Sequence, residues 1–263
     1  MRQTNPLLKT YRKLFQAFGP QRWWPAKTPF EVMVGAILTQ NTNWGNVERA
    51  IANLRTENAL TPQRFNVTTL LRLKRLIRSS GFYNQKARRL KAFSRFLIGR
   101  YGGNIAKLRR EETAKLREDL LALDGIGPET ADSILLYALG KPVFVIDAYT
   151  RRIFSRHGFL SEKHGYDDWQ GLFTDNLPRD VSLYNEYHAL IVRLAKTHCR
   201  VRPDCAGCPL KGAKAPQGHS ENGPKGRGGR RNRLISRGSL HFESRSRGYA
   251  QCRLLRSKAP GSR

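Results

Sequence analysis

The sequence predicts an all-α fold, and three observations support this expectation. Apolar residues recur at helical spacing from about residue 10 to residue 210, and short polar connectors separate these segments. No stretch shows the sustained alternation of apolar and polar residues that is typical of a half-buried strand. With 263 residues, the chain is also long enough to bury a hydrophobic core without disulfide bonds.

Nine helices are expected in this region. Pro29 and Pro128 suit the first turn of a helix, where a missing N–H group costs nothing, and Asp147 precedes its helix as an N-cap residue. The expected helices span residues 6–17, 29–40, 44–57, 69–78, 84–101, 112–121, 128–139, 148–157 and 184–197. Residues 211–263 are rich in Gly, Arg and Ser and are expected to form a disordered basic tail without a specific role in the chemistry.

The charge of the chain predicts a polyanionic partner. The chain holds 48 Lys and Arg against 20 Asp and Glu, a formal net charge of +28. Residues 211–263 contain 14 of the basic and 2 of the acidic residues, which leaves 34 and 18, a net charge of +16, in the preceding part. Such an excess attracts a phosphate backbone. No apolar run has membrane-spanning length and no signal peptide is evident, so we expect a soluble, cytoplasmic protein.

A glycine-rich turn is followed, about one helix later, by a single acidic residue. In the segment LDGIGPETAD, Gly125 and Gly127 permit a tight turn between two helices and leave backbone N–H groups open to an anion such as phosphate. Asp147 follows 20 residues after Gly127, behind the apolar run VFVI. Taken alone, the hairpin is a plain helix connector and Asp147 a plain N-cap. Their joint spacing indicates a functional site.

These segments together resemble the endonuclease III superfamily of DNA base-excision glycosylases. LDGIGPETAD followed by VIDAYTRRIFSR is similar to the helix-hairpin-helix, Gly/Pro-rich loop and aspartate signature of that family. ILTQNTNWGNV, GFYNQKARRL and CRVRPDCAGCPL resemble its strand-contacting segment, its Gly-x-Tyr-Asn-x-Lys-Ala segment and its iron–sulfur loop. The resemblance covers roughly residues 25–210.

The resemblance implies that Asp147 is the catalytic carboxylate for removal of a base from DNA. Glu129 stands where family members that also cut the strand carry a lysine nucleophile, and a glutamate cannot form a Schiff base. We therefore expect a glycosylase without lyase activity, similar to the 3-methyladenine glycosylase branch that removes alkylated bases. Three alternatives stay open: a lyase that uses another amine, a noncatalytic binder of damaged DNA, and, for Glu129 alone, simple stabilisation of the helix N-terminus.

The resemblance also implies residues that contact DNA. Gln40 and Phe82 match the positions that family members insert into the duplex, although a helix end and core packing would explain them as well. Tyr149 and Trp44 are expected to line a pocket for the extruded base, with Trp23 and Trp24 as further aromatic candidates. In the cysteine loop, Arg200 and Arg202 are expected to face the phosphate backbone, or else simply to be solvated. Double-stranded DNA with damaged bases is thus the expected partner of a monomeric, nucleoid-associated protein.

Three clustered cysteines indicate a metal or cluster site in a reducing compartment. Cys199, Cys205 and Cys208 resemble three of the four ligands that hold a 4Fe-4S cluster in the family. A fourth cysteine is missing near Lys214, and Cys252 is the only other one in the chain. Zinc, with His198 as a fourth ligand, and no metal at all are the alternatives.

The resemblance implies two helical subdomains with a DNA-binding cleft between them. The first is expected to span residues 28–141 and to contain the helix-hairpin-helix at about 112–139. The second is expected to combine residues 1–27 with 142–210 and to carry the cysteine loop at 199–208. Asp147 would lie at the mouth of the cleft.

Overall fold

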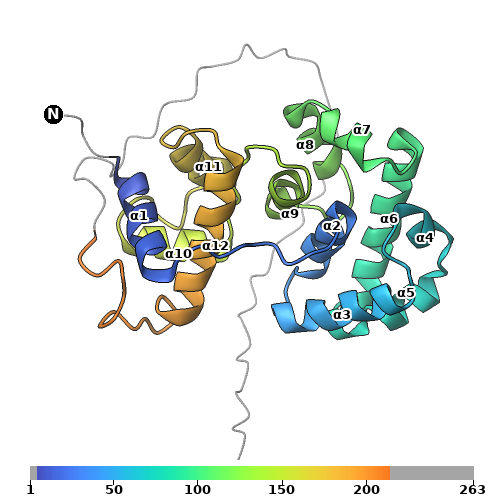
Figure 1. Cartoon of the computed structure of the whole chain (residues 1–263), viewed down its shortest axis with the longest axis horizontal. Helices are drawn as coiled ribbons and strands as arrows, with labels where there is room; N and C mark the ends of the chain where they lie inside the picture. The colour runs from blue at the N-terminus through green and yellow to red at the C-terminus, as the bar shows by residue number, and fades with distance from the viewer. Residues whose placement is uncertain (1–4, 214–263) are drawn as a thin grey trace, which may run out of the picture. The chain divides into compact units, whose positions relative to one another are not determined.

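The computed structural model describes residues 5–213, and this part of the chain is helical without a β-strand (Figure 1). The expected all-α fold is therefore confirmed. The elements are α1 (Pro6–Phe18), α2 (Pro29–Leu38), α3 (Trp44–Thr56), α4 (Pro62–Val67), α5 (Leu70–Leu76), the 3₁₀ turn η1 (Arg78–Ser80), α6 (Tyr83–Tyr101), α7 (Ile105–Arg110), α8 (Thr113–Leu121), α9 (Pro128–Ser133), the π-helical turn η2 (Ile134–Ala138), α10 (Ala148–Arg156), α11 (Tyr166–Thr174) and α12 (Val181–Thr197).

Helix starts follow from local sequence chemistry. Side-chain oxygens of Asn and Thr residues accept hydrogen bonds from the first free N–H groups of many of these helices. Proline occupies the first turn of α1, α2, α4 and α9, where its fixed backbone angle suits a helix. The capping Asn and Thr residues are Asn5, Thr28, Asn43, Thr61, Thr69 and Asn104.

Two hydrophobic cores organise the described residues. One core is built from α2 to α9, with Ile134, Leu135 and Ala138 of η2. The other is built from α1 and α10 to α12, with Leu136 of η2 and the buried residues 144–146. Tyr137 packs against both cores, so the single turn η2 contributes to each of them.

Several details differ from the expected helices. The expected helix at 69–78 ends at Leu76 and continues as η1, and the expected helix at 128–139 changes from α to π geometry at Ile134. The short helices α4, α7 and α11 were not expected, because six to nine residues with few apolar positions give only a weak periodic signal. Most of the expected tail, residues 214–263, lies outside the described residues.

A buried carboxylate ties the hairpin helices to the second core. Asp132 on α9 is fully buried, and its Oδ1 accepts a hydrogen bond of 2.7 Å from Arg117 Nε on α8. Its Oδ2 accepts from Gln170 Nε2 on α11 at 2.8 Å, and the same Gln170 nitrogen donates to the carbonyl oxygen of Phe144 at 2.7 Å. The network thus links α8, α9 and α11 to the segment that leads into α10.

No helix within residues 5–213 is both long and apolar enough to cross a membrane.

The Asp132 network should dominate the response of the fold to charge removal. Asp132→Asn leaves the partly buried Arg117 without its buried carboxylate partner and with only the exposed Asp167 at 3.7 Å, so we expect the free energy of unfolding in urea to fall by about 3–5 kcal/mol. Glu57→Gln is the matched control, because it removes the partner of Arg72 in a more exposed ion pair and should cost at most about 1 kcal/mol. Equal losses in both variants would contradict the assigned importance of Asp132.

Candidate functional site

Asp147 is held at the N-terminus of α10 with one oxygen fixed and one oxygen uncapped. The buried residues Val143–Ile146 anchor the chain in front of it. Asp147 Oδ1 accepts from the backbone N–H of Thr150 at 2.7 Å and from the Thr150 hydroxyl at 2.8 Å. Oδ2 receives neither of these bonds, and the side chain keeps 12% of its surface exposed. The predicted acid is thus an N-cap residue that still presents a carboxylate oxygen.

His188 and Tyr137 accompany this carboxylate, and sequence reasoning missed both. Nε2 of the buried His188, on α12, lies 3.5 Å from Asp147 Oδ2, and it makes no direct hydrogen bond among the described residues. Nδ1 of the same ring is 2.5 Å from the Tyr137 hydroxyl. Burial alone would raise the pKa of Asp147, but His188 and the two Thr150 hydrogen bonds lower it below its usual value.

The hairpin between α8 and α9 requires glycine at Gly125. Its φ angle of +74° lies in the left-handed region, and a Cβ atom there would lie 1.8 Å from Arg89 Nε. At Gly127 a Cβ atom would meet nothing within 4 Å, so packing does not explain that glycine. The open space beside Gly127 leaves the start of α9 approachable.

Gln40 does not project freely into solvent. Its Nε2 donates to the Gly125 carbonyl oxygen and to the Thr130 hydroxyl, both at 2.9 Å. Arg89 Nη1 donates to its Oε1 at 2.6 Å. Instead of the simple solvent-facing helix end that was an alternative reading of the sequence, Gln40 is an anchor between the end of α2 and the hairpin.

Glu129 lies close enough to Asp147 for the two charges to interact. The Glu129 side chain reaches the surface. Desolvation of its carboxyl group by neighbouring protein atoms, and then the charge of Asp147, raise the pKa of Glu129 from 4.5 to about 7. His188 and Arg151 act in the opposite direction. Near neutral pH the two carboxylates thus have different tendencies to ionise, with Asp147 the more acidic.

The two lysines nearest to the motifs in sequence are engaged elsewhere. Lys86 is buried, and its Nζ donates to the carbonyl oxygens of Leu38 at 2.8 Å and Ser80 at 2.6 Å. Burial and then Arg89 lower the Lys86 pKa to about 8. Lys141 Nζ donates to the carbonyl oxygen of Glu111 at 2.6 Å. Neither amine takes the place of Glu129.

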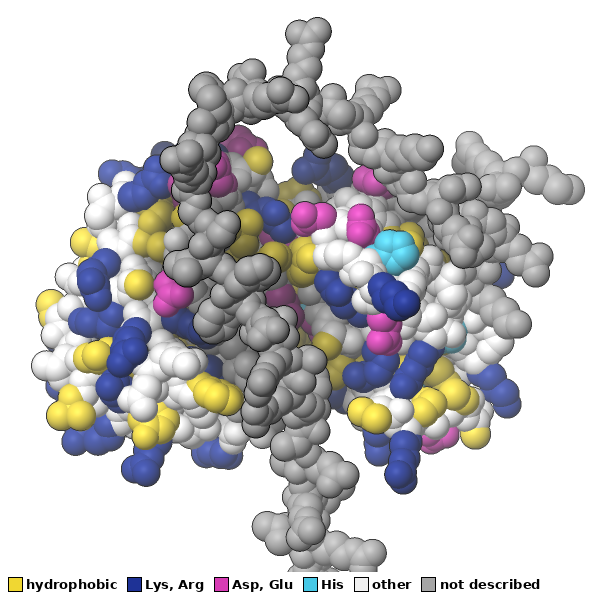
Figure 2. Space-filling view, turned by 180° about the vertical axis from the view of Figure 1, so that it is seen from behind, with side chains coloured by type: hydrophobic (Ala, Val, Ile, Leu, Met, Phe, Trp, Pro, Cys, Tyr) yellow, Lys and Arg dark blue, Asp and Glu magenta, His cyan; other side chains and the backbone are white. Residues whose placement is uncertain are grey.

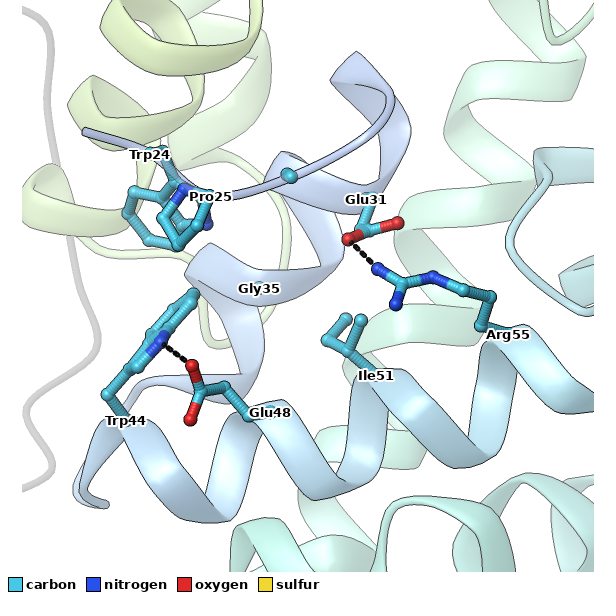
Figure 3. A pocket seen from close by; sticks show the side chains of 9 residues that line it. Trp24, Pro25, Glu31, Gly35, Trp44, Glu48, Ile51 and Arg55 are labelled. Carbon is cyan, nitrogen blue, oxygen red and sulfur yellow. Dashed lines mark hydrogen bonds and ion pairs between the residues drawn. The ribbon is translucent and has the colours of Figure 1, made fainter. Parts of the chain in front are cut away.

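An aromatic cluster borders a pocket in the first core. The rings of Trp24 and Tyr137 have centroids 5.2 Å apart, and those of Trp24 and Trp44 lie 5.1 Å apart at nearly right angles. Trp24 and Trp44 line a pocket of about 240 Å³ (Figure 3), together with Pro25, Ala26, Glu31, Gly35, Glu48, Ile51 and Arg55. Trp44 Nε1 donates to Glu48 at 2.7 Å, and Arg55 pairs with Glu31 at 2.6 Å.

Phe82 is an exposed aromatic residue in a left-handed backbone conformation. Phe82 follows η1 and is 62% exposed, so core packing does not explain it. Its φ angle is +45°, a region that bulky residues rarely adopt. Backbone outliers of this kind concentrate at functional sites.

Tyr149 belongs to the second core, and the two loop arginines are exposed. Tyr149 packs against the second core and carries the Arg152 guanidinium 5.1 Å from its ring centre. Tyr149 is not among the residues that line the pocket described above. Arg200 and Arg202 are both exposed, as a contact to a phosphate backbone would require.

The cysteine loop carries three free thiols that differ in exposure. Cys199 is buried, Cys208 is partly buried and Cys205 is exposed, and all three are free. Arg156 also donates to Cys199 Sγ at 3.4 Å. Within residues 5–213, no group of three or more His, Cys, Asp or Glu side chains is arranged to hold a metal ion. Cys252 lies outside the described residues. The loop alone therefore does not fit a four-cysteine cluster.

The structure brings together part of the predicted site. Asp147 and Glu129 lie close enough to influence each other's ionisation, and Gln40 joins the hairpin at Gly125. Thr150 was within reach of sequence reasoning, since it follows Asp147 at the spacing of an N-cap partner. His188 had no such signal, because it is a single histidine in the otherwise apolar face of a long helix.

Comparisons with known proteins are consistent with this geometry. A model of the HhH-GPD superfamily of base excision DNA repair proteins matches residues 34–179, more than half of the chain. A Methanocaldococcus jannaschii protein whose name assigns it provisionally to the DNA repair glycosylases is 50% identical over 206 residues, 78% of this chain and 94% of that protein. Endonuclease III of Thermotoga maritima is 32% identical over 184 residues, 70% of this chain and 81% of that protein.

A solved structure agrees with these relatives. The crystal structure of H. pylori 3-methyladenine DNA glycosylase bound to 1,N6-ethenoadenine matches with a TM-score of 0.64 and 29% sequence identity, over 73% of this chain and 98% of that chain. Because the superfamily model matches more than half of its length and a relative is 50% identical over 206 residues, this chain belongs to the HhH-GPD superfamily of base excision DNA repair proteins.

Proposed function

We propose that the chain is a DNA glycosylase that hydrolyses the N-glycosidic bond of a damaged base in duplex DNA, with Asp147 as the catalytic carboxylate. The observation that carries the proposal is the state of Asp147 beside the hairpin. One of its oxygens is held by Thr150, the other is free, and its surroundings favour the ionised form. Cleavage of the N-glycosidic bond builds positive charge on the deoxyribose, which a fixed carboxylate stabilises.

The DNA contacts of this proposal follow from the exposed groups. Gly125 and Gly127 open the hairpin to a phosphate, and Arg200 and Arg202 would hold a second stretch of backbone. Phe82, exposed and fixed by its backbone, suits a wedge that fills the space left by an extruded base. Lys and Arg side chains are more prominent than Asp and Glu on the face drawn in Figure 2, which favours a phosphate-rich partner.

The same proposal includes the arrangement of the molecule around DNA. Residues 28–141 and residues 1–27 with 142–210 would form two subdomains, and the duplex would bind along the cleft between them. The separate hydrophobic cores support this division, except that Trp24 and Ala26 pack against the first core. A nucleoid-associated location would follow from the DNA substrate.

Lack of lyase activity is proposed because neither of the two lysines nearest to the motifs replaces the family lysine. Glu129 stands at that position, and Lys86 and Lys141 are bound to backbone carbonyls. A lyase would require a nucleophilic amine to form a Schiff base with the sugar. Hydrolysis that leaves an abasic site is the chemistry compatible with a carboxylate pair.

An alkylated, positively charged base is the proposed substrate. The H. pylori relative is a 3-methyladenine glycosylase by name. In this chain, Trp24 and Trp44 supply electron-rich faces, and Glu48 adds a carboxylate at the same pocket (Figure 3). Both features stabilise a planar cation. Trp44 lines this pocket, as the base-pocket prediction requires. Tyr149 does not line it and would have to contact the base from another side.

Asp147→Asn tests the catalytic assignment. Asparagine caps a helix as well as aspartate does, so the fold should persist, while release of methylated bases from dimethyl sulfate-treated duplex DNA should fall by about 10³-fold. Asp180→Asn is the matched control, because Asp180 caps α12 through the N–H of Leu183 and should not affect release. Release that persists in Asp147→Asn would refute the assignment. A panel of lesion-containing duplexes identifies the base.

Glu129→Lys tests the absence of lyase chemistry. Wild-type protein and Glu129→Gln should give no covalent adduct with abasic duplex DNA in the presence of borohydride, because neither has an amine at this position. Glu129→Lys should gain a trapped adduct and strand nicking. A borohydride adduct with the wild-type protein would contradict the proposal and favour a lyase that uses another amine.

The cysteine loop is proposed to bind a 4Fe-4S cluster, with zinc or no metal as alternatives. Since only three cysteines lie within the described residues, a fourth ligand must come from elsewhere, and no step of the reaction is assigned to this group. Anaerobically purified full-length protein should contain about four iron atoms per chain, and Cys205→Ser should lose them. Zinc at one atom per chain, or neither metal, would contradict the cluster.

A further inference from the structure

The free oxygen of Asp147 faces a single buried donor. Thr150 occupies Oδ1 with two hydrogen bonds, so only Oδ2 remains for the substrate or its water. His188 Nε2 lies 3.5 Å from that oxygen, is inaccessible to solvent and has no hydrogen-bond partner among residues 5–213. Within the described residues, the imidazole nitrogen is therefore available to Asp147 alone.

The Tyr137 hydroxyl lies where it can select which nitrogen of His188 carries a proton. Burial, and then the charge of Asp147, raise the pKa of this hydroxyl well above its usual value, so it keeps its proton and is able to donate to Nδ1 of a neutral His188. A neutral imidazole that accepts at Nδ1 carries its proton on Nε2, and a protonated imidazole carries protons on both nitrogens. In both states Nε2 carries a proton and lies 3.5 Å from Asp147 Oδ2.

The surrounding charges explain why such a donor matters. Asp147 is faced by Glu129 from α9, by Tyr137 from η2 and by His188 from α12, while Arg151 on α10 acts on Glu129. Ionised Glu129 opposes the negative charge of Asp147. A donor at 3.5 Å offsets this repulsion on the side of Oδ2, which Thr150 does not reach.

We infer that His188, fixed in one tautomer by Tyr137, is a positioning residue that keeps Oδ2 of Asp147 ionised and oriented toward the sugar. The inference rests on the proposed role of Asp147 in base release. His188 does not itself contact the reacting atoms. Its effect passes through the carboxylate, and Tyr137 acts one step further away.

Nuclear magnetic resonance of the full chain tests the inference independently of activity. The variants are His188→Gln and Tyr137→Phe. Tyr184→Phe is the matched control, because the buried hydroxyl of Tyr184, on α12 like His188, has no hydrogen-bond partner among residues 5–213. The Asp147 carboxyl carbon is followed as pH is lowered, and the His188 ring nitrogens report the tautomer. In the wild type, His188 should carry its proton on Nε2.

The expected results separate a positioning role from a merely structural one. In His188→Gln and Tyr137→Phe, Asp147 should take up its proton at higher pH than in the wild type, and Tyr184→Phe should not differ. The acidic limb of the single-turnover rate of base release from dimethyl sulfate-treated duplex DNA should move with it. At neutral pH, loss of orientation should slow release by about 10- to 100-fold in His188→Gln and less in Tyr137→Phe.

An unchanged Asp147 titration in both variants would overturn the inference, and so would an Nδ1–H tautomer in the wild type. If His188→Gln does not fold, Tyr137→Phe alone decides, since its ring is retained. If the wild type releases no base from any probe, the proposed function fails, while the titration still decides whether His188 controls Asp147.

Discussion

The buried carboxylate of Asp132 is the interaction on which the site depends. The Asp132 carboxylate accepts hydrogen bonds from Arg117 on α8 and from Gln170 on α11. Gln170 also donates a hydrogen bond to the Phe144 carbonyl oxygen. The hairpin lies between α8 and α9, and Phe144 lies three residues before Asp147. One buried side chain is therefore connected to both the hairpin and the segment that precedes the acid, although these belong to different hydrophobic cores. A buried carboxylate persists in a core only when its partners satisfy it fully, which explains the three hydrogen bonds that Asp132 accepts, two from Arg117 and one from Gln170.

The turn η2 is the second link between the cores. A π-helical turn inserts an extra residue into a helix and is frequent at functional sites. Here neighbouring side chains point to different cores, with Leu135 in one and Leu136 in the other, and Tyr137 touches both. Because Tyr137 also contacts Trp24 and His188, the geometry of this turn connects the aromatic pocket with the acid. A regular α-helix would direct these three consecutive side chains differently.

Sequence reasoning succeeded where the signal was local. Short-range features include the hairpin glycines, the helix that follows them and the N-cap at Asp147. The structure contains all three in the expected order, although the helix changes to π geometry. Contacts between distant segments could not be predicted in this way. Gln40 contacts Gly125 across 85 residues, and His188 lies beside Asp147 across 41 residues, and no pattern within either segment indicates these contacts. The short helices α4 and α11 escaped for a different reason, since their stability comes from packing on the cores and not from their own periodicity.

The hydrogen bonds of Gln40 have a consequence for how such a protein would search DNA. In the free state, Gln40 is committed to the carbonyl of Gly125, the hydroxyl of Thr130 and the guanidinium of Arg89. If Gln40 inserts into the duplex, as the resemblance implies, it has to give up these three bonds, and partners in the DNA would have to replace them. Intact DNA, whose bases are already paired, offers no such replacement, whereas a base that has lost its partner does. The resting contacts of Gln40 would thus act as a threshold that discourages opening of undamaged sites.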